Sequence, residues 1–262
     1  MVFQNNILAG VGGQVTDAAY TVANSCRFND DDSAHLVRTG LGTPTDSKLF
    51  TCSSWLKRGN ITGDGELFFS GIDGSGTDRS HFGLDSSNQL YFQGEYGGAT
   101  PVSVASTALY RDPGAWYHFM MVYDADNDIQ LERVRLYVNG QRITDFSTET
   151  IPSSAGQEVD FIQSGNDMYI GRHSASSTVA NHFDGYLSQH CLIDGHGLRP
   201  ESFGEFNNGV WRPIDITGLT FSGNAWLLDF ADSSDLGNDV SGLNNDFTSS
   251  GLAAADRMVD TP

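Results

Sequence analysis

The sequence predicts an all-β protein, built as an antiparallel two-sheet sandwich or jelly roll. Its 262 residues include 30 Gly, 16 Phe and 9 Tyr, a composition typical of many short strands joined by tight turns. Short apolar runs alternate with turns rich in Asp, Gly and Ser, and long helical patterns are few. A chain of this length can form one β domain and can bury roughly 70–75% of its unfolded surface. It therefore needs no disulfide or metal merely to hold a core.

Residues 115–140 form the centre of the predicted fold, because two strand-length runs there flank an acidic turn, as in an antiparallel hairpin. In the second run, apolar residues alternate with side chains that can meet water, namely Arg133, Arg135 and Tyr137. In the first run both faces are largely apolar, which predicts a strand covered on both sides. We therefore assign the strand tryptophans to the core: Trp55, Trp116 and Trp226. Asn139-Gly140 accepts positive φ and closes the run, so residues 141–146 can return as a third strand.

The other elements follow from similar runs. Before the hairpin, strands are predicted at residues 23–28, 34–38, 48–57, 66–72, 79–84, 89–93 and 104–110. After a polar connection they resume at residues 168–172, 183–193 and 225–230. Strict alternation in 183–193 groups Leu187, Cys191 and Ile193 on one face and Tyr186, Ser188 and His190 on the other. Pro200 lies near the start of one short helix, residues 199–203. An N-terminal arm or linker (1–22) and a C-terminal tail (251–262) flank the domain at 23–250.

Charge and cysteine content restrict the partners and the compartment. The chain has 33 acidic and 14 basic side chains, a formal charge of −19. Nucleic acid and anionic membranes are poor partners for such a field. The N-terminus lacks the basic region of a secretory signal, and no run approaches the roughly 18 apolar residues of a membrane helix. We expect synthesis in the cytoplasm, with Cys26, Cys52 and Cys191 as buried free thiols; one disulfide among them is the alternative.

Several blocks of sequence, in order, carry a resemblance to a known family: SCRFNDDDSAHLVRT, CSSWLKRGN, YRDPGAWYHFMMVYD with VRLYVNG, YIGR, FDGYLSQHCLIDG, FGEFNNGVW, and LGNDVSGLNNDF with MVDTP. Together they resemble the laminin-G-like, concanavalin A-like lectin/glucanase domains of tailed-bacteriophage virion proteins. The resemblance runs from about Ser25 to the last residue. It implies a jelly roll located in the virion, in contact with other virion proteins through the N-terminal arm. Host-surface polysaccharide is a further implied partner, and analogy with fibres and spikes suggests a trimer.

The same fold family contains glycan hydrolases, so we looked for their chemistry. A glycanase needs two carboxylates that flank the scissile bond. The glucanase pattern Glu-x-Asp-x-x-Glu is approached at residues 158–163, but its last position is Gln163, and an amide cannot exchange a proton as the acid/base must. The lipase elbow Gly-x-Ser-x-Gly and the zinc motif His-Glu-x-x-His do not occur. We expect a protein without enzymatic activity.

Sugar-binding candidates come from the side chains that usually grip a sugar ring. Aromatic rings cover its apolar C–H face, and polar groups meet its hydroxyls. The aromatic candidates are Tyr91, Tyr96, Tyr186 and Trp211. His173, which follows a predicted strand at a sandwich edge, and His190 are the histidine candidates. Ordinary packing is the alternative for each aromatic, and a surface or hydrogen-bonded side chain is the alternative for each histidine.

The acidic segment 229–246 is the candidate metal site. Ca²⁺ takes six to eight oxygen ligands, which a glycine-bearing turn rich in carboxylates can supply. The candidate ligands are Asp229, Asp232, Asp235, Asp239 and Asn244. The alternative is a solvated turn in which Asp and Asn cap their own backbone.

We therefore consider three functions. The first is a non-enzymatic bacteriophage structural protein with a lectin-like module, displayed on the particle and contacting host-surface glycan. The second is a purely structural capsid-decoration or tail-assembly protein that binds no sugar. The third, a glycan hydrolase, is the least supported because the carboxylate pair is incomplete.

Overall fold

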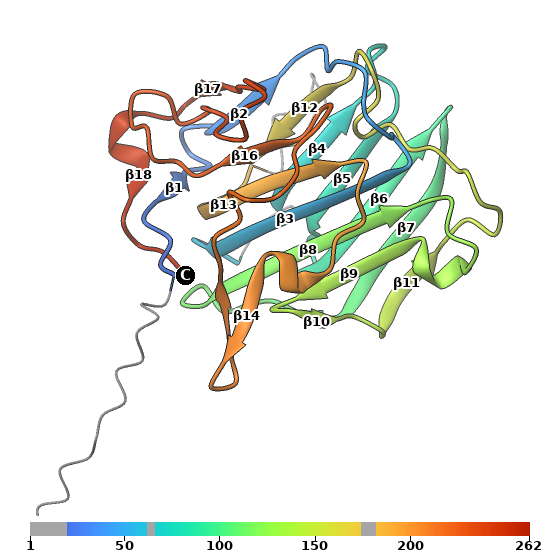
Figure 1. The fold of residues 1–262 in the computed structure, drawn as a ribbon, viewed down its shortest axis with the longest axis horizontal. Helices are drawn as coiled ribbons and strands as arrows, with labels where there is room; N and C mark the ends of the chain where they lie inside the picture. The colour runs from blue at the N-terminus through green and yellow to red at the C-terminus, as the bar shows by residue number, and fades with distance from the viewer. Residues whose placement is uncertain (1–19, 62–65, 174–181) are drawn as a thin grey trace, which may run out of the picture.

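The computed structural model describes residues 20–61, 66–173 and 182–262. Most of the predicted arm, residues 1–22, thus lies outside the described residues. Two antiparallel sheets pack face to face (Figure 1). The helices in the described chain are three short 3-10 turns: η1 (Gln130–Glu132), η2 (Pro200–Ser202) and η3 (Ala254–Asp256). The prediction of an all-β sandwich is confirmed, and η2 occupies the place of the predicted short helix. None of the described helices is long and apolar enough to cross a bilayer.

The strands form two large sheets and one separate hairpin. Sheet A has the order β10 (Gln141–Arg142), β9 (Val134–Val138), β8 (Trp116–Asp124), β3 (Leu49–Arg58), β13 (Gly185–Asp194), β1 (Ser25–Phe28), β18 (Arg257–Met258), with β16 (Trp226–Leu228) also paired to β13. Sheet B has the order β11 (Phe146–Thr150), β7 (Ala99–Leu109), β6 (Gln89–Tyr96), β5 (Arg79–Leu84), β4 (Glu66–Ile72), β12 (Asp167–Ile170), β2 (His35–Arg38), β17 (Thr248–Ser250). The hairpin β14 (Gly204–Asn207) and β15 (Val210–Pro213) projects from the body (Figure 1).

Strand β8 is covered on both faces, as its sequence predicts. On the inner face, Phe119 stacks on Phe68 of sheet B, with ring centroids 5.7 Å apart. On the outer face, Met120 and Val122 pack under a layer formed by the chain after β13, which includes Phe203. All of these side chains are 0–1% exposed. Sheet A therefore has the sandwich core on one side and a second apolar cluster on the other.

Trp116 does not lie in the core, and its assignment there is wrong. It is half-buried at the first position of β8, and its indole Nε1 donates to the Asp260 carboxylate at 3.2 Å. Trp55 and Trp226 are buried, at 3% and 0% exposure. The difference arises because the apolar layer over sheet A does not extend to the start of β8. A pattern of alternating residues does not reveal how far such a layer reaches.

The predicted faces of β13 are wrong because the strand contains a bulge. Its register with β3 shifts between Ser188 and Cys191, and Gln189 has a φ of 40°. The extra residue reverses the alternation, so Leu187 belongs to the core between the sheets whereas Cys191 belongs to the outer cluster. His190 consequently faces inward, where it stacks on Phe69 with centroids 4.0 Å apart.

The C-terminal residues are part of the domain, unlike the separate tail predicted for 251–262. Strand β18 pairs with β1, and Asp256 accepts hydrogen bonds from Arg27 at 2.8 and 3.1 Å. Asp260 forms an ion pair with Lys57 at 2.8 Å. The last residues thus hold the edge of sheet A.

Three buried histidines are neutral. His118 accepts a hydrogen bond at Nδ1 from the indole of Trp211 at 3.2 Å, and because an indole can only donate, Nε2 carries the proton toward Ser53 at 2.8 Å. Burial lowers the pKa of His118 to about 3, and it does the same for His81 and His190.

One ion pair is also buried. Arg58 donates to both carboxylate oxygens of Glu66 at 2.9 and 3.0 Å, and to Asn88 and the carbonyl of Tyr110. These partners occupy both sides of the guanidinium fork. The three cysteines are buried and free, as predicted.

Candidate functional site

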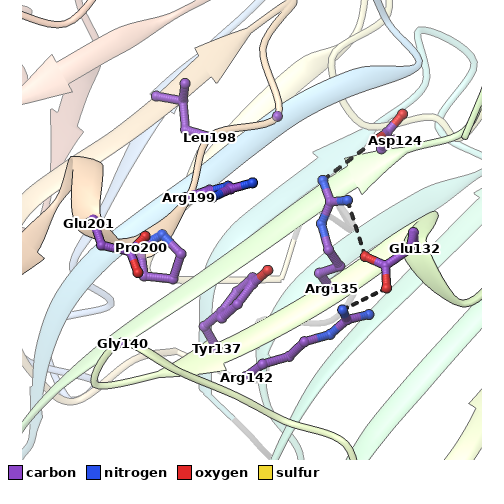
Figure 2. Close-up of a pocket in the computed structure, with 11 residues that line it drawn as sticks. Asp124, Glu132, Arg135, Tyr137, Gly140, Arg142, Leu198, Arg199, Pro200 and Glu201 are labelled. Atoms are coloured by element: carbon purple, nitrogen blue, oxygen red, sulfur yellow. Dashed lines mark hydrogen bonds and ion pairs between the residues drawn. The ribbon is translucent and has the colours of Figure 1, made fainter.

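A polar cleft of about 520 Å³ lies on the outer face of sheet A, where β9 and β10 meet the chain that precedes η2. Figure 2 shows the side chains that line it. They are Asp124, Glu132, Arg135, Tyr137, Gly140, Arg142, Gly197, Leu198, Arg199, Pro200 and Glu201. Its volume is within the range of small-ligand sites.

The floor of the cleft follows from the alternation in β9. Val134 and Leu136 point into the core, so Arg135 and Tyr137 point outward, as predicted. Strand β10 returns beside β9 and places Arg142 opposite Tyr137.

The predicted Asn139-Gly140 turn joins these two strands, with φ of 48° and 75°. A Cβ at Gly140 would lie 2.6 Å from ring atoms of Trp211. The turn therefore needs glycine for its conformation and for the indole behind it.

The opposite wall is formed by residues 197–201. A Cβ at Gly197 would lie 3.2 Å from Nη2 of Arg135, so this glycine lets the wall approach the floor. Pro200 is buried at the first position of η2 and fixes the chain there, while Arg199 and Glu201 on either side of it are exposed.

Carboxylates hold two of the three cleft arginines. Arg142 donates to Glu132 at 2.7 Å and to the carbonyl of Leu131 at 2.9 Å. Arg135 contacts Asp124 and Glu132, each at 3.5 Å (Figure 2). The hydrogen bond from Arg142 is the main cause that lowers the pKa of Glu132. Glu132 is therefore a fixed anion and a poor proton donor.

Three donor groups in the cleft lack short hydrogen bonds within the described chain. The contacts of Arg135 are longer than the 2.7–3.2 Å typical of hydrogen bonds. The guanidinium of Arg199 forms no ion pair and no hydrogen bond with described residues. The hydroxyl of Tyr137 forms no hydrogen bond with them. Burial raises the pKa of Tyr137, so its hydroxyl keeps the proton. In Figure 2, Arg199 extends toward Arg135, and the Tyr137 hydroxyl points into the space beside them. The arrangement can bind a ligand rich in oxygen acceptors.

Comparison with known proteins places the chain in a family. Residues 29–194 match the model of the concanavalin A-like lectin/glucanases superfamily. The chain belongs to this superfamily. A search of curated proteins found no match.

Solved structures of low sequence identity are similar to this chain. A protein of Bacteroides ovatus proposed to bind carbohydrate is 14% identical with a TM-score of 0.54, covering 88% of this chain and 58% of its own. A pentraxin of Limulus polyphemus is 16% identical with a TM-score of 0.47, covering 69% and 80%. Tailspike protein 2 of bacteriophage CBA120 is 12% identical with a TM-score of 0.44, covering 68% and 26%. At these identities the likeness concerns the fold alone.

Two of the six predicted sugar-contact residues lie near each other, on the outer face of sheet B. Tyr91 lies on β6, diagonal to His81 of the neighbouring strand β5. The ring of His173 lies 4.4 Å from that of His81. Burial raises the pKa of Tyr91 and lowers that of His173. These side chains lie at sheet B and are separate from the cleft on sheet A.

The other four are dispersed. Tyr96 is the last residue of β6, and its hydroxyl donates to Glu158 at 2.6 Å. Tyr186 lies on the outer face of sheet A beside Trp116, with ring centroids 6.4 Å apart. His190 is 0% exposed in the core, and Trp211, which belongs to β15, is 8% exposed with its ring stacked on that of His118. The ring of Trp211 is engaged in packing, which is the alternative considered for the aromatics. His190 shares a hydrogen bond with Ser54 at 3.1 Å, which is the alternative considered for the histidines.

The carboxylates of the glucanase-like stretch lie at the rim of the sandwich. Val159 and Phe161 are buried in the core, which turns the side chains of Glu158 and Asp160 outward. Burial raises the pKa of Asp160 to about 6. Gln163 donates to the carbonyl of Val159 at 3.5 Å.

The predicted calcium ligands cap their own turns. Asp239 accepts hydrogen bonds from the backbone N–H groups of Leu227, Ser241 and Asn245 at 2.9 Å. Asp229, Asp232 and Asp235 each accept from an N–H two residues later, and Asn244 has a φ of 57°. Across the described residues, no group of three or more His, Cys, Asp or Glu side chains is placed to hold a metal. Calcium binding stays a prediction, which a melting curve with and without calcium would test.

Sequence reasoning did not single out the cleft as a site. It placed Arg135 and Tyr137 on a water-facing strand and Arg199 at the start of a helix. The two walls are about 60 residues apart in the chain, since residues 124–142 supply one and 197–201 the other. The signal available was the alternation of Arg135 and Tyr137 on one predicted strand. Arg133, which was predicted to face water with them, is instead 5% exposed and donates to two backbone carbonyls outside the cleft.

Proposed function

We propose that this chain is a non-enzymatic, lectin-like module of a bacteriophage virion protein, which binds host-surface glycan through the cleft on sheet A. One observation carries the proposal. Three hydrogen-bond donors that lack short hydrogen bonds within the described chain, from Arg135, Tyr137 and Arg199, converge in one open cleft. Such a surface suits a ligand covered with hydroxyl and carbonyl oxygens. The superfamily fold is compatible with this role but does not establish it.

The cleft offers both kinds of contact that a sugar needs. Its donors face the hydroxyl oxygens, while Glu201 and Asp124 supply acceptors for hydroxyl protons. The ring of Tyr137 and the side chains of Leu198 and Pro200 supply apolar surface for the C–H groups.

A binding role is favoured over hydrolysis by the protonation state of the cleft. A glycosidase requires one carboxylic acid that holds a proton near neutral pH. Glu132 is ionised by its contacts with Arg142 and Arg135. Release of new reducing ends from a polysaccharide that the protein binds would contradict this part of the proposal.

The virion context is supported by the ordered sequence blocks that resemble phage virion domains. In this setting the protein is located in the virion and contacts other virion proteins through residues 1–22. Mass spectrometry of purified particles of the phage that encodes the chain tests this location, and absence of the chain from the particles would refute it.

The test of glycan binding uses the full chain on a glycan array and in a cell-adsorption assay. Tyr137→Phe removes one donor from the cleft, and we expect affinity to fall about 2- to 10-fold, the value of one hydrogen bond. Tyr169→Phe is the matched control, because Tyr169 lies on β12 of sheet B, outside the cleft, and is not a sugar-contact candidate. An array and an adsorption assay that both stay blank would remove the glycan function.

A second candidate, assembly without sugar binding, is favoured by the projecting hairpin. Phe206 on β14 and Val210 on β15 are 51% and 62% exposed. Exposed apolar side chains on a projecting element suit contact with another subunit. Replacing both with Ser would lower incorporation into particles and leave glycan binding unchanged if assembly uses this hairpin.

A further inference from the structure

The charged side chains of the cleft are unevenly paired. Three arginines and three carboxylates line it, yet the contacts are unevenly shared. Glu132 contacts both Arg135 and Arg142, and Asp124 contacts Arg135. Arg199 and Glu201 form no ion pair with each other, although both line the same cleft. The positive charge of Arg199 therefore has no contacting anion within the described chain.

The donors near this charge are of the kind that bind a carboxylate. A guanidinium presents paired N–H groups that bind the two oxygens of a carboxylate together. Arg199 and Arg135, whose own contacts are long, face the same space beside the protonated hydroxyl of Tyr137 (Figure 2). A neutral hydroxyl would use one of these donors and leave the charge of Arg199 uncompensated.

We infer that the glycan residue held in this cleft carries a carboxylate, as uronic and nonulosonic acids do, and that Arg199 binds it. This inference rests on the glycan-binding function proposed above and specifies its ligand. The formal charge of −19 repels polyanions at long range. A single carboxylate in direct contact with Arg199 lies well within the screening length of roughly 8 Å, so the local contact determines its binding.

The experiment compares matched ligands and matched variants of the full chain. The ligands are oligosaccharides that contain uronic or nonulosonic acid, each paired with its methyl ester, which is neutral but otherwise the same. Calorimetric titration gives both affinities for the wild type, for Arg199→Gln and for Arg212→Gln. Arg212 is the control because it lies on β15, outside the cleft, with only a 3.5 Å contact to Glu205. Melting temperatures establish that the variants are folded.

We expect the wild type to bind an acid at least about 10-fold more tightly than its ester, because this is the affinity that a hydrogen bond between charged groups contributes. Arg199→Gln should remove this preference by weakening the acid alone, and Arg212→Gln should retain it. If acid and ester bind equally while Tyr137→Phe weakens both, glycan binding stands and the carboxylate inference is wrong. If sulfated sugars bind and carboxylated ones do not, the inference is also wrong. If no sugar binds the wild type, both proposals fail.

Discussion

The three buried neutral histidines predict a loss of stability in mild acid. His81, His118 and His190 are 5%, 0% and 0% exposed, and burial lowers the pKa of each to about 3. In the unfolded chain a histidine has a pKa of about 6.5. Between these values the unfolded state binds a proton that the folded state does not, so the free energy of unfolding falls as the pH falls.

The magnitude is about 1.4 kcal/mol per pH unit for each histidine. At pH 5, about 1.5 units below the unfolded pKa, each histidine costs roughly 2 kcal/mol and the three cost roughly 6 kcal/mol. A domain is typically stable by about 5–15 kcal/mol, so this loss is a large share of the total. Glu66 and Asp160 act in the opposite direction, because burial raises their pKa values to about 7 and about 6, and the folded state takes up these protons first. Single variants are therefore needed to isolate each histidine.

Urea unfolding between pH 7 and pH 4 measures the effect. His118→Gln and His190→Leu each remove one titrating group, and each should reduce the pH slope by about 1.4 kcal/mol per unit, whatever its effect on stability at pH 7. His196→Gln is the control because His196 is exposed. A slope that is the same in the wild type and in both core variants would refute the assignment of these histidines as neutral buried groups.

Two further predictions concern stability and use urea unfolding at neutral pH. Arg58→Ala leaves the carboxylate of Glu66 buried without its partner and should cost about 3–5 kcal/mol, whereas Arg212→Ala, at a surface ion pair, should cost less than about 1 kcal/mol; similar losses would contradict the buried pair. Gly140→Ala should cost about 1–2 kcal/mol for its positive φ and about 1–3 more for overlap with an indole, whereas Gly97→Ala, at φ 61° in open space, should show only the first loss. Equal losses would refute the overlap.

The fold could be predicted because its signals are local. Alternation in β9 and a positive-φ turn at Asn139-Gly140 each depend on a few neighbouring residues. The errors arose where a distant or inserted residue decides the outcome. One extra residue, Gln189, reverses the faces of β13, and no glycine at residues 188–191 marks the bulge. The alternation in β8 predicts a buried Trp116, because it does not show how far the apolar layer over sheet A extends.

The cleft was harder to predict than the fold, because its two sides come from parts of the chain that are distant in sequence. The floor, with Arg135 and Tyr137, lies within residues 29–194, which match the superfamily model. The opposite wall, with Arg199 and Glu201, belongs to the chain after residue 194, which forms the extra layer over sheet A. A likeness that ends at residue 194 therefore describes the scaffold without the wall that completes the cleft. The ligand has to be sought from the chemistry of this added wall, and Arg199 is the residue whose substitution tests it most directly.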